Sequence, residues 1–227
     1  MTTPVADRAR TAGSQTAGSQ TAGSRRSRPS KGEQTRRAVL DAAIARFGRD
    51  GFRPTSVADI ARDAGVGGTV AYAYFPNKEA LFLAALDEDA AAVITDGLAH
   101  VFAHRGVAEW REGLLLTLVA AVERHPLARR VLAGLEPDVT DRVLDLPALA
   151  ELRKTVAARL CEDQQTGLVR HDIDATAVGH GVVAIVLSLL MSVVQLGTEV
   201  VAAYASDVVA VFEAAMAPLS GDRATKG

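Results

Sequence analysis

Two short helical segments joined at one glycine limit the possible folds of this chain more than any other feature. Residues 56–74 read SVADIARDAGVGGTVAYAY. In the first segment, apolar residues recur at i, i+3, i+4 and i+7 from Val57, and Ser56 opens the S-x-x-D pattern of a capping box. Gly65 stands where a tight turn needs a positive φ. The spacing is that of a helix-turn-helix, although an ordinary corner between two helices has the same spacing.

Helical periodicity continues through the rest of the chain. Apolar residues make up 48% of the sequence but aromatic residues only 4%, so the core is expected to consist of Ala, Val and Leu. There is no sustained alternation with period two, which argues against a β fold. We therefore predict an all-α fold, with helices at residues 34–50, 57–64, 68–74, 77–103, 107–124, 127–135, 137–144, 148–165, 173–196 and 198–216.

The charge of the chain is divided between its two ends. Residues 1–78 carry 13 Lys and Arg against 6 Asp and Glu, whereas residues 79–227 carry 12 against 21. A basic front on an acidic body indicates that only the front meets a polyanion such as DNA.

The N-terminal segment has a composition typical of a disordered arm. Residues 11–24 repeat small polar residues as TAGSQTAGSQTAGS, and residues 25–31 read RRSRPSK. Such a segment cannot bury enough apolar surface to offset its ordering entropy. The basic residues either form a solvated linker or follow the phosphates and minor groove of DNA.

Residues 35–86 carry a more specific pattern, with the successive motifs LDAAIARF, GF-x-x-TSVADIA, AGV and YFPNKEAL. This stretch resembles the N-terminal domain of the TetR (tetracycline-repressor) family of transcriptional regulators. Residues 87–217 resemble the family only in general plan. The resemblance implies a three-helix helix-turn-helix DNA-binding domain at 32–80 and a larger helical ligand-binding and dimerisation domain at 81–217. Residues 1–31 remain an arm and 218–227 a loose tail.

The resemblance also implies a mode of action. Family members are homodimers that pair through their last two long helices, and a small molecule bound in the body releases them from DNA. Two symmetric heads predict a palindromic operator. Basic side chains on phosphates predict an affinity that falls with salt.

Candidate DNA contacts follow from the match to the family and from the chemistry of helix ends. Hydroxyls at the start of the second helix suit phosphate, and the third helix presents side chains to bases. The tyrosines are alternatively packing residues of the small core. The candidates are Thr55, Ser56, Gly68, Thr69, Val70, Tyr72, Ala73, Tyr74 and Lys78, with Arg25, Arg26 and Arg28 of the arm.

The predicted reading helix departs from the family pattern at its start. Gly67 stands where a serine cap is frequent, and Gly68 where a long polar side chain is frequent. Glycine caps acceptably but adds no side-chain hydrogen bond. We therefore expect apolar contacts to thymine methyl groups from Val70 and Ala73, a hydroxyl contact from Thr69, and additional specificity from the arm and from DNA shape.

The body is expected to hold a pocket for a hydrophobic or amphipathic effector, because the residues available to line it are mostly aliphatic. The candidates from position and apolarity are Phe102, Trp110, Leu114, Thr117, Leu118, Leu152 and Val183.

Residues 175–198 contain no formal charge over 24 positions. The length would span a membrane. Against this, the stretch includes His180, Gln195 and three glycines, and it has no basic or aromatic flanks. A helix covered by its own body on one side and by a second subunit on the other needs the same composition. We interpret it as a dimer interface without a membrane.

Other functional classes have weaker signals. Asp96, His100 and His104 fall at i, i+4 and i+8 and are candidate metal ligands, but a solvated helix face gives the same spacing. The sequence has no nucleophile elbow, phosphate loop or dinucleotide fingerprint, so we predict no enzyme and no cofactor. A lone Cys161 and a polar N-terminus suit the cytoplasm.

The sequence as a whole predicts a dimeric, DNA-binding transcriptional regulator, a repressor released from its operator by a small effector. The alternative is a helical metal- or small-molecule-binding protein without a transcriptional role.

Overall fold

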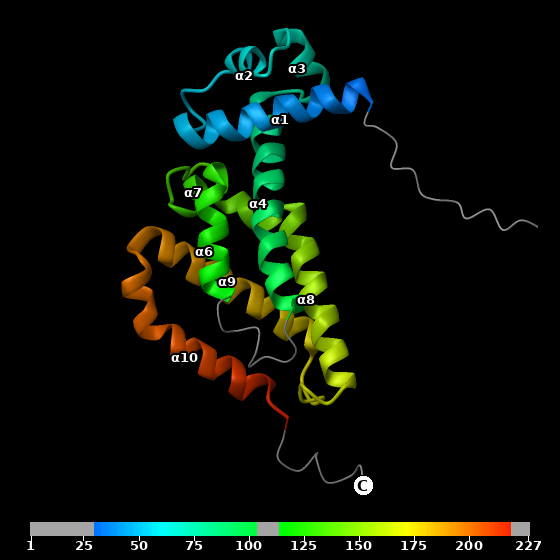
Figure 1. The fold of residues 1–227 in the computed structure, drawn as a ribbon, viewed down its shortest axis with the longest axis vertical. Coiled ribbons are helices and arrows are strands. Elements are labelled where there is room, and N and C mark those ends of the chain that lie inside the picture. Colours follow the sequence, from blue (N-terminus) through cyan, green and yellow to red (C-terminus); the bar gives the residue numbers. More distant parts are fainter. Residues whose placement is uncertain (1–29, 104–113, 219–227) are drawn as a thin grey trace, which may run out of the picture.

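The computed structural model describes residues 30–103 and 114–218, and within these ranges the chain is helical and contains no strand (Figure 1). This confirms the all-α prediction. The elements are α1 (Lys31–Asp50), α2 (Val57–Asp63), α3 (Gly68–Tyr74), α4 (Lys78–Ala103), α6 (Leu114–Arg124), α7 (Pro126–Leu132), the 3-10 helix η1 (Thr140–Asp145), α8 (Pro147–Gln165), α9 (Ala175–Leu196) and α10 (Thr198–Met216).

Local capping and turn chemistry explain where several helices begin and end. α1 starts three residues earlier than predicted, because Ser30 and Glu33 form a reciprocal capping box. Asn77 caps α4 as predicted, since its Oδ1 accepts from the Ala80 amide at 2.7 Å. The helix predicted at 127–135 ends at Leu132, and Gly134 follows with a φ of 74°. The helix predicted at 137–144 is instead the short 3-10 turn η1.

The head of the molecule, at the top of Figure 1, consists of α1, α2 and α3 with the first turns of α4. Its core is built around three phenylalanines. The ring centroid of Phe82 lies 5.1 Å from those of both Phe47 and Phe52, in edge-to-face contact. Edge-to-face aromatic pairs add stability beyond the area they bury. Aromatic residues are therefore scarce in the whole chain but concentrated where the small head most needs volume.

The core of the head extends into the body. Leu127 and Val131 of α7, together with Val139 and Leu146, belong to the same buried cluster as the residues of α1 to α4. Gly48 makes this contact possible, because a Cβ there would lie 2.7 Å from Pro126 Cβ. The predicted boundary between residues 80 and 81 thus runs through a continuous core.

Two buried carboxylates hold α7 in place. Asp89 Oδ2 on α4 accepts from the amides of Leu127 and Ala128, each at 2.9 Å, and so caps the start of α7. Its Oδ1 lies 2.9 Å from His125 Nδ1. After α7, Glu136 Oε1 accepts from Arg130 Nε at 2.6 Å and from the Phe52 amide at 3.2 Å. The first carboxylate ties α7 to α4, and the second ties it to the loop between α1 and α2.

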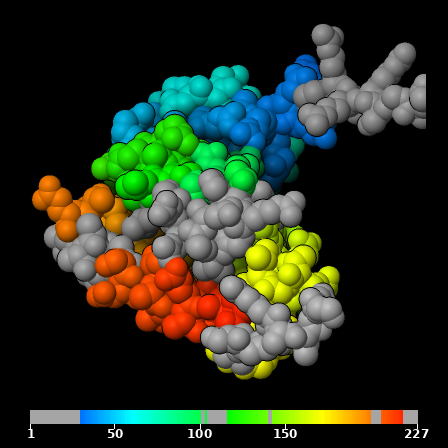
Figure 2. Space-filling view, turned by 60° about the horizontal axis from the view of Figure 1, so that its bottom comes forward, coloured from blue at the N-terminus to red at the C-terminus, as the bar shows by residue number. Residues whose placement is uncertain are grey.

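The body below the head is a second helical layer with its own core. α4, α6, α8 and α9 surround a cluster that includes Val122, Leu160 and Val182. Gly179 lets α9 approach α8 closely, since a Cβ there would lie 3.0 Å from Ala157 Cα. α10 lies across the surface of the body, at the end away from the head (Figure 2).

The Gly48 contact yields a prediction about stability. Gly48→Ala should lower the free energy of unfolding by about 1–3 kcal/mol, because the added methyl meets the backbone of α7. Gly181→Ala is the matched control, since a Cβ at this helical glycine meets nothing within 4 Å. It should raise stability by about 0.5–1 kcal/mol. Urea denaturation measures both, and a stabilising Gly48→Ala would contradict the close approach of α1 and α7.

Candidate DNA-binding site and internal cavity

α2 and α3 form the predicted helix-turn-helix on one side of α1. Gly65 has a φ of 68°, as the turn requires. Buried Ala71 fixes α3 against the head core, and Val57 and Ile60 do the same for α2. α3 begins at Gly67 without a side-chain cap. Its short length and the absence of a cap mean that packing, rather than intrinsic helicity, holds α3 in shape.

The outward face of α3 carries most of the predicted base-contact residues. Tyr72 is 53% exposed and Val70 37% exposed, which is unusual for large apolar side chains in a small domain. The other exposed members of this face are Gly68, Thr69 and Ala73. The face is therefore small, smooth and mostly apolar, and Tyr72 is its only long side chain with a hydrogen-bonding group.

Tyr74 has a mixed position. Its side chain is half-buried and packs against the head core, whereas its hydroxyl reaches the start of α1, 3.5 Å from where a Cβ on Gly32 would lie. The tyrosine thus combines the packing role and the surface role that the sequence left open. It also shows that α1 begins beside the end of α3.

Thr55 and Lys78, which the sequence predicts to contact phosphate, make hydrogen bonds inside the head. Thr55 is 3% exposed, and its hydroxyl donates to the Gly51 carbonyl at 2.7 Å. The Lys78 ammonium donates to the carbonyls of Phe52, Arg53 and Thr55, at 2.9, 3.2 and 3.1 Å, and lies 4.4 Å from the Phe52 ring centroid. Since an ammonium has three donors, Lys78 is fully used in holding the loop before α2.

Ser56 caps α2 but is also engaged with an acid. Its Oγ accepts from the Asp59 amide at 3.1 Å and donates to Asp59 Oδ2 at 2.7 Å. The Ser56 hydroxyl and Arg62 hold the pKa of Asp59 below its ordinary value. Asp59 is therefore ionised at neutral pH and places a negative charge next to the predicted phosphate contact.

Most arginines of the head are neutralised by such carboxylates. Arg46 Nε donates to Asp63 at 2.6 Å and keeps the pKa of that carboxyl low, and Arg53 pairs with Asp138 at 2.6 Å. Arg37, Arg49 and Arg62 also have carboxylate partners. Paired cations contribute less to the field that attracts DNA. The basic character that the sequence predicts for the front is thus weaker on the folded head than its composition indicates.

Two exposed cations stand near the start of α1: Lys31, which the sequence places at the end of the basic arm, and Arg36, which sequence reasoning missed. Lys31 lies in the first turn, and Arg36 stacks over the Phe75 ring, 5.3 Å from its centroid. Phe75 directly follows α3, so Arg36 stands beside the reading helix. The signal in the sequence was a Lys and an Arg five residues apart before the apolar stripe. The predicted arm residues Arg25, Arg26 and Arg28 lie outside the described residues, and the arm joins α1 at this same edge.

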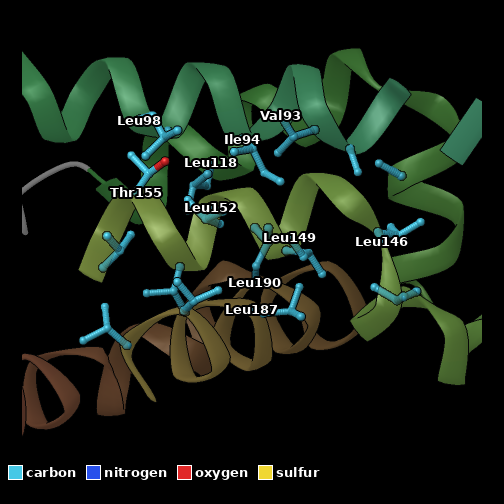
Figure 3. Close-up of a pocket in the computed structure, with 18 of the residues that line it drawn as sticks. Val93, Ile94, Leu98, Leu118, Leu146, Leu149, Leu152, Thr155, Leu187 and Leu190 are labelled. Atoms are coloured by element: carbon cyan, nitrogen blue, oxygen red, sulfur yellow. The ribbon is translucent and has the colours of Figure 1, made fainter. Parts of the chain in front are cut away.

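The body contains one well-formed cavity in the part of the chain that is described. Its volume is about 140 Å³, and its walls come from α4, α6, α7, α8 and α9 (Figure 3). Leu118, Leu152 and Val183 line it as predicted, with many further aliphatic side chains such as Ile94 and Leu187.

The other predicted lining residues are not part of this wall. Thr117 contacts His100 Nδ1 through its hydroxyl at 3.3 Å. Trp110 and the side chains of Phe102 and Leu114 lie outside the described residues.

Comparison with known proteins agrees with this arrangement. Residues 39–85 match the family model for bacterial regulatory proteins of the tetR family. This stretch of the chain is thus similar to the DNA-binding domain of the TetR family. The chain is 28% identical over 207 residues to the HTH-type transcriptional regulator YdgC of Bacillus subtilis, covering 85% of this chain and 98% of that protein. The family and this relative are transcriptional regulators that bind DNA, and not enzymes.

Solved structures of the family share the fold. A TetR-family regulator from Mesorhizobium loti has a TM-score of 0.60 at 20% identity, over 83% of this chain and 100% of that one. Thermus thermophilus FadR, a TetR-family repressor solved with lauroyl-CoA, has a TM-score of 0.56 at 21% identity, over 78% of this chain and 92% of that one. At this level of identity, the likeness extends to the fold.

The predicted metal ligands do not assemble into a site among the described residues. Asp96 forms an ion pair with Arg124, and His100 contacts Thr117. His104 lies outside the described residues. In the described ranges, no group of three potential ligands comes together.

α9 is the one described helix that is long and apolar enough to cross a membrane. Only 28% of its most apolar window is buried inside the structure. His180, which the sequence left between a core and a ligand-binding role, is exposed on this helix. α8 packs on a different face of α9, the one that contains Gly179, and leaves His180 uncovered.

Mutation can separate the structural role of Lys78 from the predicted DNA contact of Tyr72. Lys78→Met should lower the free energy of unfolding by about 1–3 kcal/mol, because three carbonyls lose their donor. Tyr72→Ala should change it by less than about 0.5 kcal/mol, yet weaken DNA binding tenfold or more. Chemical denaturation and gel shifts on a duplex selected by the wild-type protein measure the two effects. If Lys78→Met is as stable as the wild type but no longer binds DNA, the result would support a phosphate contact by Lys78.

Arg36 should contribute to the salt dependence of binding. Arg36→Ala should reduce the slope of log affinity against log salt by about 0.9, the value for one phosphate contact. Lys154→Ala is the control, since Lys154 is an equally exposed cation on α8, far from the head. Fluorescence anisotropy between low and moderate salt gives the slopes. Equal slopes for the wild type and Arg36→Ala would exclude Arg36 from the interface.

Proposed function

We propose that this regulator is a dimeric repressor that leaves a palindromic operator when a small apolar or amphipathic molecule enters the cavity of its body. It acts in the cytoplasm, where its operator is. The observation that carries the proposal is that the cavity and the head share part of their walls. Leu86, Val131 and Leu146 belong to the core of the head and also line the cavity.

Leu86 of α4 and Val131 of α7 sit on helices that run from the cavity to the head, and Leu146 directly precedes α8. α4 contributes Val93 and Ile94 to the cavity and Leu81 and Phe82 to the head core. α7 lines the cavity with Ala128 and packs Leu127 into the head core. Because packed interiors resist compression, a ligand that widens the cavity displaces the helices around it, and a displacement of α4 or α7 is passed to α1, which contacts both. This is a direct route from effector to reading helix.

The two buried carboxylates that hold α7, Asp89 and Glu136, couple its position to those of its neighbours. Asp89 joins α7 to α4 through two amide hydrogen bonds, and Glu136 joins the end of α7 to the Phe52 amide before α2. Buried hydrogen bonds to a carboxylate are among the stronger ones in a protein. A displacement of α7 is therefore passed to the loop that carries the helix-turn-helix.

The exposed faces of α9 and α10 support a dimer. Ile185, Leu196 and Val211 are 38%, 60% and 61% exposed. The outward face of α9 also carries the small exposed residues Ala184 and Ser188. Small residues allow a second helix to approach closely, and exposed aliphatic patches on a soluble regulator mark a protein partner. The same face explains the apolar composition of α9 without a membrane.

The cavity limits the size of the effector. Its volume of about 140 Å³ is close to that of an engineered protein cavity of about 150 Å³ that holds benzene. The lauroyl-CoA bound by Thermus FadR is far larger. For this chain we therefore expect a smaller effector, with an aliphatic or aromatic body.

Discrimination of the operator then depends on few polar atoms. Thr69 and Tyr72 supply the hydroxyls on α3, and Val70 and Ala73 suit thymine methyl groups. Arg25, Arg26 and Arg28, which precede α1 in the sequence, are further cations for the DNA backbone or minor groove. Narrow A·T-rich minor grooves attract such arginines, so DNA shape contributes to recognition.

The dimer and the operator are tested together. Ile185→Glu places a charge on the outward face of α9 and should convert the protein to a monomer with affinity for a palindromic duplex reduced at least tenfold. Leu168→Glu is the control, because Leu168 is similarly exposed at 43% but lies in the turn before α9. Sedimentation velocity and gel shifts on in vitro selected duplexes give both readouts. A monomeric wild-type protein, or selected sites without symmetry, would overturn the proposal.

A further inference from the structure

Three polar residues lie in a row along the α8 side of the cavity, although nearly all of the surface that faces the cavity is apolar. Thr155, Arg159 and Asp163 of α8 lie at i, i+4 and i+8 on the face that lines the cavity. Figure 3 shows Thr155 among the leucine side chains that fill the neighbouring wall. The Thr155 hydroxyl donates to the Glu151 carbonyl at 2.9 Å, so its proton is already used.

Among these three residues, Asp163 stands out because it is a buried carboxylate with one unpaired oxygen. Its residue is 4% exposed, and its Oδ1 accepts from Arg159 Nε at 3.1 Å. Its Oδ2 is buried and accepts no hydrogen bond. An unsatisfied oxygen of a buried carboxylate is costly, because the group has lost water without gaining a donor.

The other buried carboxylates of the described structure differ from Asp163. Asp89 uses both oxygens, with two amides on one and His125 on the other. Glu136 accepts from an amide and from Arg130. Among the described side chains, Asp163 Oδ2 is the only buried nitrogen or oxygen atom without a partner. Native proteins rarely keep such an atom without a use for it.

We propose that Asp163 Oδ2 is the acceptor that selects the effector, and that the effector is a small neutral molecule with an aliphatic body and one hydroxyl or N–H donor. This inference rests on the proposed function only in taking the cavity as the effector site. It adds the chemical class of the ligand and the residue that recognises it.

The ion pair between Asp163 and Arg159 favours a ligand that is a neutral hydrogen-bond donor. The carboxylate of Asp163 is already paired with Arg159, so a second cation in the apolar cavity would lack a counter-charge. An anionic ligand would face the free oxygen of Asp163 and be repelled. A neutral hydroxyl satisfies the oxygen without adding charge.

Two probes of the same size isolate the donor. 1-Hexanol and methyl pentyl ether have the same atoms, but only the alcohol can donate a hydrogen bond. Calorimetric titration of the full-length wild-type protein, in the absence of DNA, should show the alcohol binding roughly tenfold or more tightly, as expected for a hydrogen bond to a buried charged acceptor. Hexanoate and hexylammonium should bind more weakly than the alcohol.

Variants then assign the preference to Asp163. In Arg159→Met/Asp163→Leu both charges are replaced by apolar side chains of similar size, and the alcohol and the ether should bind equally. In Asp163→Asn the amide can donate to the ether oxygen, so the ratio should fall even if the double variant does not fold. Glu162→Gln, on the exposed side of the same helix, should keep the wild-type preference.

Several results would overturn the inference. These are equal binding of alcohol and ether by the wild type, tighter binding of hexanoate or hexylammonium, no binding of any probe, or a preference that survives in Asp163→Asn. Release of DNA is not the readout. A protein that selects the alcohol but keeps its operator would contradict the proposed repressor mechanism and leave the role of Asp163 intact.

Discussion

The close approach of α7 to α1 is the contact on which the rest of the architecture depends. Gly48 allows Pro126 to pack directly on α1, and Leu127 then enters the core of the head. A head made of α1 and the two short helices α2 and α3 has little interior of its own, because small domains bury a small fraction of their surface. Residues of the body that pack into the head enlarge its buried core. For the same reason, the position of α3 depends on the packing of the body.

The parts of the structure that the sequence predicted well are those determined by neighbouring residues. α3, the turn at Gly65 and the cap at Asn77 depend on backbone preference and on side chains three or four positions away. The sequence pattern contains this information directly. For the same reason, the family resemblance over residues 35–86 was strong, since the motif is one continuous segment.

The features that the sequence did not predict depend on residues far apart in the chain. Nothing near Lys78 in the sequence indicates that its ammonium would meet carbonyls of residues 52, 53 and 55. Nothing in the sequence around Asp163 indicates that its carboxylate would be buried with one oxygen unpaired. Pairing of head arginines with carboxylates is equally invisible in a count of charges, which is why the composition overstated the positive field of the head.

The outward face of α3 and the wall of the cavity both contain few polar groups. α3 presents a smooth apolar surface in which Thr69 and Tyr72 supply the hydroxyls, and the cavity presents an aliphatic wall with one free acceptor at Asp163. In our proposals, these few polar atoms distinguish between similar partners, because an unpaired polar atom costs more than a missing methyl contact. A change at one of them is therefore expected to alter specificity far more than stability, whereas changes at the shared core between α3 and the cavity alter both.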